Sequence, residues 1–197
     1  MMRTITYFHS LSSPWAYLGG PRFHEIVRRH SLSVVLRPVT IISENGGIPL
    51  RTRPQARQDY HELELDRWRK HLGMPLNLRP RYYPTDPTQS ARMVIAADRA
   101  GFNALNLSHA LLRALWAEEQ DTLDPAVRRR VADGVGLDGA ALVVAENSPD
   151  VIFAWEASRA EAVTSAVFGT PTYIYKGERF WGQDRLDFLD RAVQRDT

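Results

Sequence analysis

Apolar and polar positions follow different periods along the chain, and each change of period marks an expected element. The runs RTITYF (3–8) and SVVLRPV (33–39) are short and rich in β-branched and aromatic residues, as is typical of strands. The stretch between them has helical character and ends near His30. A strand, a helix and a strand in this order favour a parallel strand pair with a right-handed crossover. The pattern therefore predicts a βαβ unit.

From about Leu50 to Ala166 the signals are almost exclusively helical. Three helices are predicted to begin at residues that can cap them, namely Ser90, Asp124-Pro125 and Ser148-Pro149. A further amphipathic helix is predicted over residues 110–119, whereas residues 79–89, rich in proline and tyrosine, are predicted to form an ordered loop. We interpret the middle of the chain as a helical insertion.

Strand character returns after the insertion. TPTYIYKGERFWG (170–182) is typical of two strands joined at Lys176-Gly177, where the glycine supplies the positive φ of a tight turn. QDRLDFLDRAVQ (183–194) has the spacing of an amphipathic helix. The order of elements predicts an α/β fold, with a discontinuous domain over residues 1–40 and 167–197 and an all-helical insertion domain over residues 41–166.

The composition excludes several classes of chemistry. The chain of 197 residues contains no cysteine, which excludes disulfides, thiolate metal ligands and a dithiol redox cycle of its own. Lys and Arg number 25 against 23 Asp and Glu, so the bulk charge does not indicate a nucleic-acid partner. The six histidines lack metal-ligand spacing, and no metal is predicted.

Membrane and secretion signals are not evident in the sequence. The apolar runs are shorter than the roughly 20 residues that span a bilayer. The N-terminal residues MMRTITYFHS lack the apolar stretch and cleavage site of a secretory signal. We therefore expect a soluble, cytoplasmic protein without a membrane partner.

Ser13 is the first candidate for chemistry. Ser13-Pro14 has the signature of a helix N-cap followed by proline at the first helical position, so the hydroxyl can act as a cap alone. Alternatively, the start of the helix stabilises a bound anion to which the hydroxyl donates. No Gly-x-Ser-x-Gly pattern surrounds Ser13, so a serine hydrolase is set aside. His9 is interpreted as structural.

Two segments near the C-terminus are further candidates. Pro171 opens a strand, either as an edge proline or after a cis bond; a cis bond leaves the backbone of Thr170 free to pair with an extended ligand. WGQDR (181–185) opens the last helix, where Asp184 either begins the helix or takes part in ligand binding.

These segments together resemble a known family. Ser13-Pro14-Trp15-Ala16 stands where the DsbA-like branch of the thioredoxin superfamily carries Cys-Pro-x-Cys, and a hydroxyl in place of the first thiol is the mark of the kappa-class glutathione transferase group. Within that group, SSPWAYLGG, GTPTYIY and FWGQDRLDFL resemble the 2-hydroxychromene-2-carboxylate isomerase family. The resemblance implies a thioredoxin-like βαβ…ββα fold with a large all-helical insertion, glutathione as cofactor and a homodimer.

The resemblance also implies a reaction and its residues. Glutathione thiolate adds to the ring-opened 2-hydroxychromene-2-carboxylate, and elimination gives trans-o-hydroxybenzylidenepyruvate, a step of aromatic catabolism. Ser13 is the implied catalytic residue and donates to the glutathione sulfur. The implied glutathione-binding residues are Ser13, Asn45, Thr170, Pro171, Trp181, Gly182, Gln183, Asp184 and Arg185. The predicted substrate residues are Asn45, Tyr83 and Arg51.

Two departures from the family pattern affect these expectations. Ser10 stands where relatives often carry aspartate, and no lysine lies between Val35 and Leu50. If a lysine in that segment binds the substrate carboxylate in relatives, either Arg51 or Arg53 replaces it here or the substrate differs. Two other functions compete with the isomerase: a kappa-like glutathione transferase or peroxidase acting on another electrophile, and a non-catalytic thioredoxin-fold binding module. A conjugate that accumulates favours the first, and a lack of glutathione affinity favours the second.

Overall fold

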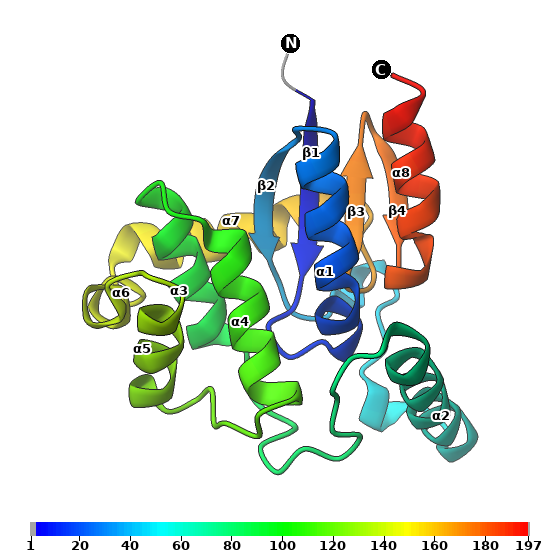
Figure 1. The fold of residues 1–197 in the computed structure, drawn as a ribbon, viewed down its shortest axis with the longest axis horizontal. Helices are drawn as coiled ribbons and strands as arrows, with labels where there is room; N and C mark the ends of the chain where they lie inside the picture. The colour runs from blue at the N-terminus through cyan, green and yellow to red at the C-terminus, as the bar shows by residue number, and fades with distance from the viewer. Residues whose placement is uncertain (1–2, 197) are drawn as a thin grey trace.

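The computed structural model describes residues 3–196, and at its centre lies a four-stranded mixed sheet (Figure 1). The strands are β1 (Thr4–His9), β2 (Ser33–Pro38), β3 (Thr172–Tyr175) and β4 (Glu178–Trp181). In the order β2-β1-β3-β4, β1 is parallel to β2 and antiparallel to β3, and β4 is antiparallel to β3. The predicted βαβ unit and C-terminal hairpin are both present, and Lys176 and Gly177 at the turn have φ values of +48° and +82°.

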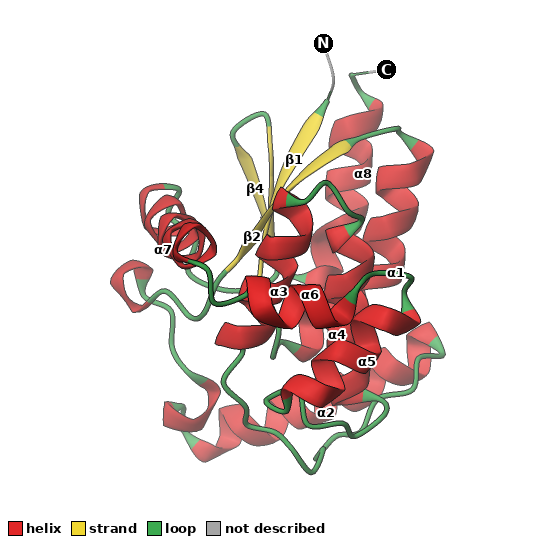
Figure 2. Cartoon of the chain, turned by 90° about the vertical axis from the view of Figure 1, so that its left-hand side faces the viewer, coloured by secondary structure: helices red, strands yellow, loops and turns green. Residues whose placement is uncertain are grey.

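Helices cover both faces of this sheet. α1 (Pro14–Arg29) and α8 (Leu186–Gln194) lie on one face, and α7 (Pro149–Thr164) lies on the other (Figures 1 and 2). The remaining α-helices are α2 (Gln55–Leu72), α3 (Thr88–Arg99), α4 (Ala104–Trp116), α5 (Pro125–Gly134) and α6 (Gly139–Ala145). Single 3-10 turns form η1 (Ser43–Asn45), η2 (Leu50–Thr52) and η3 (Gln183–Arg185).

β1 sends alternate side chains to the two faces of the sheet, as a strand must. Ile5 and Tyr7 join the large core on the side of α1 and α8. Phe8 points to the other side, where it packs in a smaller cluster with Val39, Ile42, Ala162 and Val167. Since Ala162 lies on α7, this cluster attaches α7 to the sheet.

The large core continues from the sheet into the predicted insertion. It contains Leu18 and Phe23 from α1 together with Leu111 from α4 and Leu142 from α6. α7 falls within the predicted insertion of residues 41–166 but packs against β2 as part of the layer over the sheet. The two predicted domains thus share one core, and the boundaries between them stay a prediction.

Two predicted helix boundaries differ from the structure. α3 begins at Thr88 rather than at Ser90, because Asp86 Oδ1 accepts hydrogen bonds from the Thr88 N–H at 2.9 Å and from its hydroxyl at 2.6 Å. The helix predicted over residues 110–119 is α4, which already begins at Ala104 because the side chain of Asn103 caps it. In both cases a local side-chain bond fixes the start of the helix.

The other two predicted caps have different outcomes. Asp124 is confirmed as a cap, since its Oδ1 accepts from the Ala126 N–H at 2.8 Å. Ser148 occupies the cap position of α7, but its hydroxyl donates to the Ala145 carbonyl at 2.8 Å instead of accepting from α7. Residues 79–89 form a loop up to the start of α3, as predicted.

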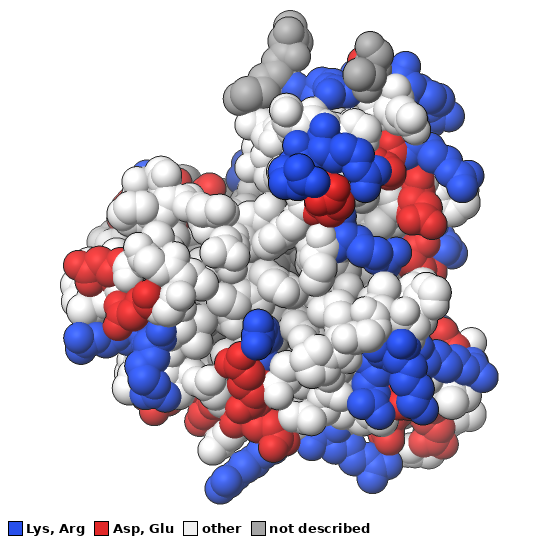
Figure 3. Space-filling view, in the orientation of Figure 1, with Lys and Arg blue, Asp and Glu red and all other residues white. Residues whose placement is uncertain are grey.

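Charged side chains of both signs are interspersed over the face of the molecule displayed in Figure 3, around a largely uncharged middle. None of the helices within residues 3–196 combines the length and the apolar character needed to cross a membrane.

Buried histidines make the stability of the fold sensitive to acid. His9 lies fully buried with Nε2 2.7 Å from the Ser108 hydroxyl, as expected of a structural histidine. Burial lowers the pKa of His9 to about 4, and burial with the neighbouring His24 and Arg113 lowers the pKa of His109 to about 4 as well. Unfolding restores the ordinary pKa of about 6.5, so below that pH the unfolded chain binds more protons.

We therefore expect the free energy of unfolding to fall as the pH decreases from about 6.5 towards 4. His9 alone contributes a loss of about 2 kcal/mol at pH 5. Urea denaturation at pH 7 and pH 5 measures the difference. His9→Asn should weaken this pH dependence, whereas His71→Gln, which changes an exposed histidine on α2, should leave it intact. Equal stability of the wild type at both pH values would contradict the assignment.

Candidate active site

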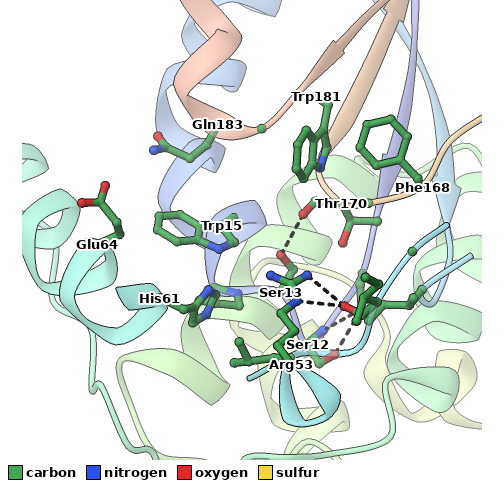
Figure 4. Close-up of a pocket in the computed structure, with 18 of the residues that line it drawn as sticks. Ser12, Ser13, Trp15, Arg53, His61, Glu64, Phe168, Thr170, Trp181 and Gln183 are labelled. Atoms are coloured by element: carbon green, nitrogen blue, oxygen red, sulfur yellow. Dashed lines mark hydrogen bonds between the residues drawn. The ribbon is translucent and has the colours of Figure 1, made fainter. Parts of the chain in front are cut away.

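A cavity of about 560 Å³ opens where the start of α1, the loop before β3, η3 and α2 meet (Figure 4). Its size lies within the range of small-molecule sites, roughly 300–1,000 Å³. Two glycines of α1 allow this helix to lie close to its neighbours. A Cβ on Gly19 would lie 2.9 Å from the Cβ of Gln183 in η3, and a Cβ on Gly20 would lie 2.3 Å from Nδ1 of His109 in α4. The glycines therefore allow α1 to pack against η3 and α4 at once.

Ser13 lies at the start of α1 and lines the cavity. Its Oγ accepts a hydrogen bond from the Ala16 N–H at 3.2 Å, so the capping function is present. The hydroxyl proton is directed to the Thr170 carbonyl at a long distance of 3.5 Å. Because the cap uses Oγ only as an acceptor, the proton remains available to a stronger acceptor in the cavity.

The loop before β3 faces Ser13 across the cavity. The peptide bond between Thr170 and Pro171 is cis, which decides between the two alternatives left by the sequence. Thr170 lines the cavity, whereas Pro171 is buried behind it, where its carbonyl accepts from the Gly182 N–H at 2.8 Å. Pro171 thus fixes the backbone of Thr170 and does not itself form the wall.

The segment WGQDR forms the opposite wall. Trp181, Gly182, Gln183 and Asp184 line the cavity, but Arg185 does not; its Nη1 binds the Asp184 carboxylate at 2.8 Å. Arg22 of α1 holds this wall in place, since its Nη2 donates to the Gln183 carbonyl at 2.7 Å and also contacts the Gln183 side-chain oxygen. Four of the five predicted residues therefore gather in one wall, next to the start of α8.

Asn45 is placed differently from the expectation. It does not belong to the cavity wall, although its neighbours Gly46 and Gly47 do. Its amide donates to the carbonyls of Ala162, Val163 and Val167 at 3.2, 3.1 and 2.8 Å. The side chain is turned away from the cavity because its amide binds these carbonyl groups, which lie near the end of α7 and in the turn that follows it. Asn45 thus positions the loop of the cavity.

The predicted substrate residues are only partly brought together. Tyr83 lines the cavity, and burial raises the pKa of its hydroxyl. Arg51 is exposed and lies outside the wall, whereas Arg53, the alternative considered from the sequence, lies within it. Nε and Nη2 of Arg53 donate to the Ile48 carbonyl at 3.1 and 2.8 Å, which fixes the guanidinium at the cavity.

Sequence reasoning missed the contribution of α2. One face of this helix lines the cavity with Arg57, Tyr60, His61, Glu64 and Trp68. The spacing of three and four residues was available as a signal, but polar and aromatic residues on a helix face are usual at solvent. Trp68 packs against the large core and also reaches the cavity.

Within residues 3–196, no group of three or more acidic or histidine side chains is arranged to hold a metal ion. The side chains that line the cavity offer hydroxyl, imidazole, guanidinium and carboxylate groups.

The chain is similar to known proteins over nearly its whole length. Residues 4–194 match the DSBA-like thioredoxin domain family. A 2-hydroxychromene-2-carboxylate isomerase from Sphingobium xenophagum is 27% identical over 194 residues, which cover 96% of this chain and 97% of that protein.

Two solved structures share the fold. A 2-hydroxychromene-2-carboxylate isomerase superposes with a TM-score of 0.81 at 24% identity, covering 98% of this chain and 95% of the other. The cytosolic disulfide reductase DsbM from Pseudomonas aeruginosa with GSH superposes with a TM-score of 0.71 at 18% identity, covering 97% and 99% of the two chains. The predicted thioredoxin-like fold and the resemblance to the isomerase family are thus confirmed, and the chain belongs to the family of DSBA-like thioredoxin domains.

Proposed function

We propose that the protein is a glutathione-dependent isomerase that interconverts 2-hydroxychromene-2-carboxylate and trans-o-hydroxybenzylidenepyruvate. The similarity to proteins named 2-hydroxychromene-2-carboxylate isomerase supports the reaction, because it extends over nearly the full length of both chains. The observation that carries the proposal is the Ser13 hydroxyl, which faces the cavity at the start of a helix and opposite the backbone of Thr170.

Ser13 supports a thiolate site for a physical reason. Its oxygen is held by the Ala16 N–H, while its proton has only a distant acceptor. The positive end of the α1 dipole favours an anion at the same place, and the Trp15 N–H has no acceptor among residues 3–196. A sulfur placed here is stabilised in its ionised form.

The remaining groups of the cavity suit the peptide part of glutathione. Within the described residues, the Thr170 N–H has no hydrogen-bond partner, so it can pair with the extended backbone of a peptide ligand. The Asp184 carboxylate is suited to an ammonium group, and the N–H groups at the start of η3 are suited to a carboxylate. When bound, glutathione supplies the thiolate that adds to the conjugated double bond and leaves again after rotation.

The other end of the cavity suits an aromatic acid. Trp15, Tyr83 and Trp68 provide aromatic surfaces, and Arg53 provides a fixed guanidinium for a carboxylate. We therefore propose that Arg53, and not Arg51, binds the carboxylate of the substrate. The proposal includes membership of the kappa-class group and a homodimer, which the family resemblance implies, and a cytoplasmic location, as expected from the sequence.

The experiment that tests this function is an assay with 2-hydroxychromene-2-carboxylate, with and without glutathione. We expect the trans product to form only when glutathione is present and glutathione to be recovered unchanged. Accumulation of a glutathione conjugate would instead identify a transferase. A protein that does not bind glutathione in a titration would be a binding module, and the proposal would be rejected.

A further inference from the structure

His61 of α2 has a place in the cavity that the function described so far does not use. Its ring meets the Trp15 ring edge-on, with centroids 5.3 Å apart and an interplanar angle of 89° (Figure 4). Trp15 follows Ser13 by two residues in the first turn of α1, so His61 lies at the end of the cavity where the reaction is proposed to occur.

The ring nitrogens of His61 are not engaged by the protein. Within residues 3–196 no hydrogen bond involves either nitrogen, whereas His9 is bonded to Ser108 and His30 to Asp190. Burial, with a smaller contribution from Arg53, lowers the pKa of His61 to about 4. The imidazole is therefore neutral near pH 7 and presents both a proton acceptor and a proton donor to a ligand.

The other titratable side chains of the wall are less suited to move a proton. The Glu64 carboxylate is already engaged by Arg67, with Nη1 2.5 Å from Oε1. Asp184 is bound by Arg185. Burial raises the pKa of Tyr83, so its hydroxyl stays protonated. Among the described residues that line the cavity, His61 is the only histidine.

The proposed substrate requires such a group. In 2-hydroxychromene-2-carboxylate the hydroxyl is attached to the carbon next to the ring oxygen, so the molecule is a cyclic hemiketal. Its double bond cannot rotate until the ring opens. Ring opening breaks the bond between C2 and the ring oxygen, removes the proton of the hydroxyl and adds a proton to the phenolate oxygen that leaves.

We propose that His61 is the general acid–base catalyst that opens and closes this ring. One imidazole nitrogen accepts the hydroxyl proton while the oxygen electron pair forms the C2 carbonyl and the ring oxygen departs. The imidazole then returns the proton to the phenolate oxygen, so that no net proton is gained or lost. This inference rests on the proposed isomerase function.

The test measures ring opening without glutathione and therefore separately from isomerisation. Exchange between the closed and open forms of 2-hydroxychromene-2-carboxylate is followed by NMR exchange spectroscopy in the presence of the protein. We expect the wild type to accelerate the exchange, and His61→Ala and His61→Gln to lose about 10²-fold of that acceleration. Imidazole in the buffer should restore part of it to His61→Ala, where the substitution leaves space.

The matched control is His71→Gln on the same helix, because His71 is exposed and outside the cavity wall. An unchanged glutathione titration shows that the His61 variants are folded. The inference is overturned if both His61 variants keep the exchange rate within threefold, or if the wild type does not accelerate it. In that case glutathione-dependent formation of the trans product would still uphold the proposed function, whereas its absence in the wild type would reject both.

Discussion

Ser13→Ala is expected to lower kcat/KM for glutathione-dependent isomerisation by about 10²-fold, the typical effect of removing one hydrogen-bond donor from a developing or bound anion. The substitution removes the hydroxyl as a hydrogen-bond donor, whereas the Ala16 N–H and the helix dipole remain. Ultraviolet absorbance of the bound thiolate, followed against pH, gives the second readout. The pKa of bound glutathione should lie below that of the free thiol in the wild type and rise in the variant.

Ser13→Ala also removes a helix cap, which costs about 1 kcal/mol of stability. Asn103→Ala is the matched control, because Asn103 caps α4 by accepting from the Asn106 N–H at 3.1 Å and lies outside the cavity wall. Both variants should lose similar stability in urea, but only Ser13→Ala should lose turnover. Equal kcat/KM values for the two variants would refute the catalytic role and leave Ser13 as a cap.

Glu146→Gln is expected to lower the free energy of unfolding by about 3–5 kcal/mol, because it leaves a buried guanidinium without its counter-charge. Nη2 of Arg128 on α5 lies 2.5 Å from Glu146 Oε1, and both side chains are almost fully buried. Nη1 of Arg128 also donates to the carbonyls of Thr122 and Leu123, each at 2.8 Å. The pair thus joins α5, the loop before it and the end of α6.

Two further variants test this assignment by urea denaturation. Glu118→Gln removes an exposed partner of Arg113 at 2.8 Å and should cost less than about 1 kcal/mol. Replacing both buried partners, as in Arg128→Met with Glu146→Leu, should recover most of the stability that Glu146→Gln loses. If Glu146→Gln stays within 1 kcal/mol of the wild type, the pair is not a stabilising connection of the insertion.

Arg22 contacts several of the elements that form the cavity. It lies on α1, donates to the Gln183 carbonyl of η3 and stacks over the Trp68 ring of α2, 5.6 Å from its centroid. Three walls of the cavity therefore depend on one side chain. Because the cavity is formed between separate elements, its shape is set by contacts such as these.

Patterns within short segments of the sequence determined the elements and several of the site residues. Short runs of β-branched and aromatic residues predicted the strands, and Ser13-Pro14 predicted the start of α1, since a cap bond joins residues three apart. Trp181 to Asp184 could be assigned to the site because one motif places them together. These features depend on neighbours in the chain, which a sequence displays directly.

Long-range packing decided the rest. The Asn45 amide binds carbonyl groups more than a hundred residues away at the end of α7, and no local pattern contains those partners. The face of α2 that carries His61 and Glu64 turns to the cavity because η3 and α1 provide the opposite walls. The sequence by itself thus determined the strands, the helical character of the middle of the chain and the start of α1. The tertiary structure decided which side chains meet, because such contacts depend on how distant elements pack.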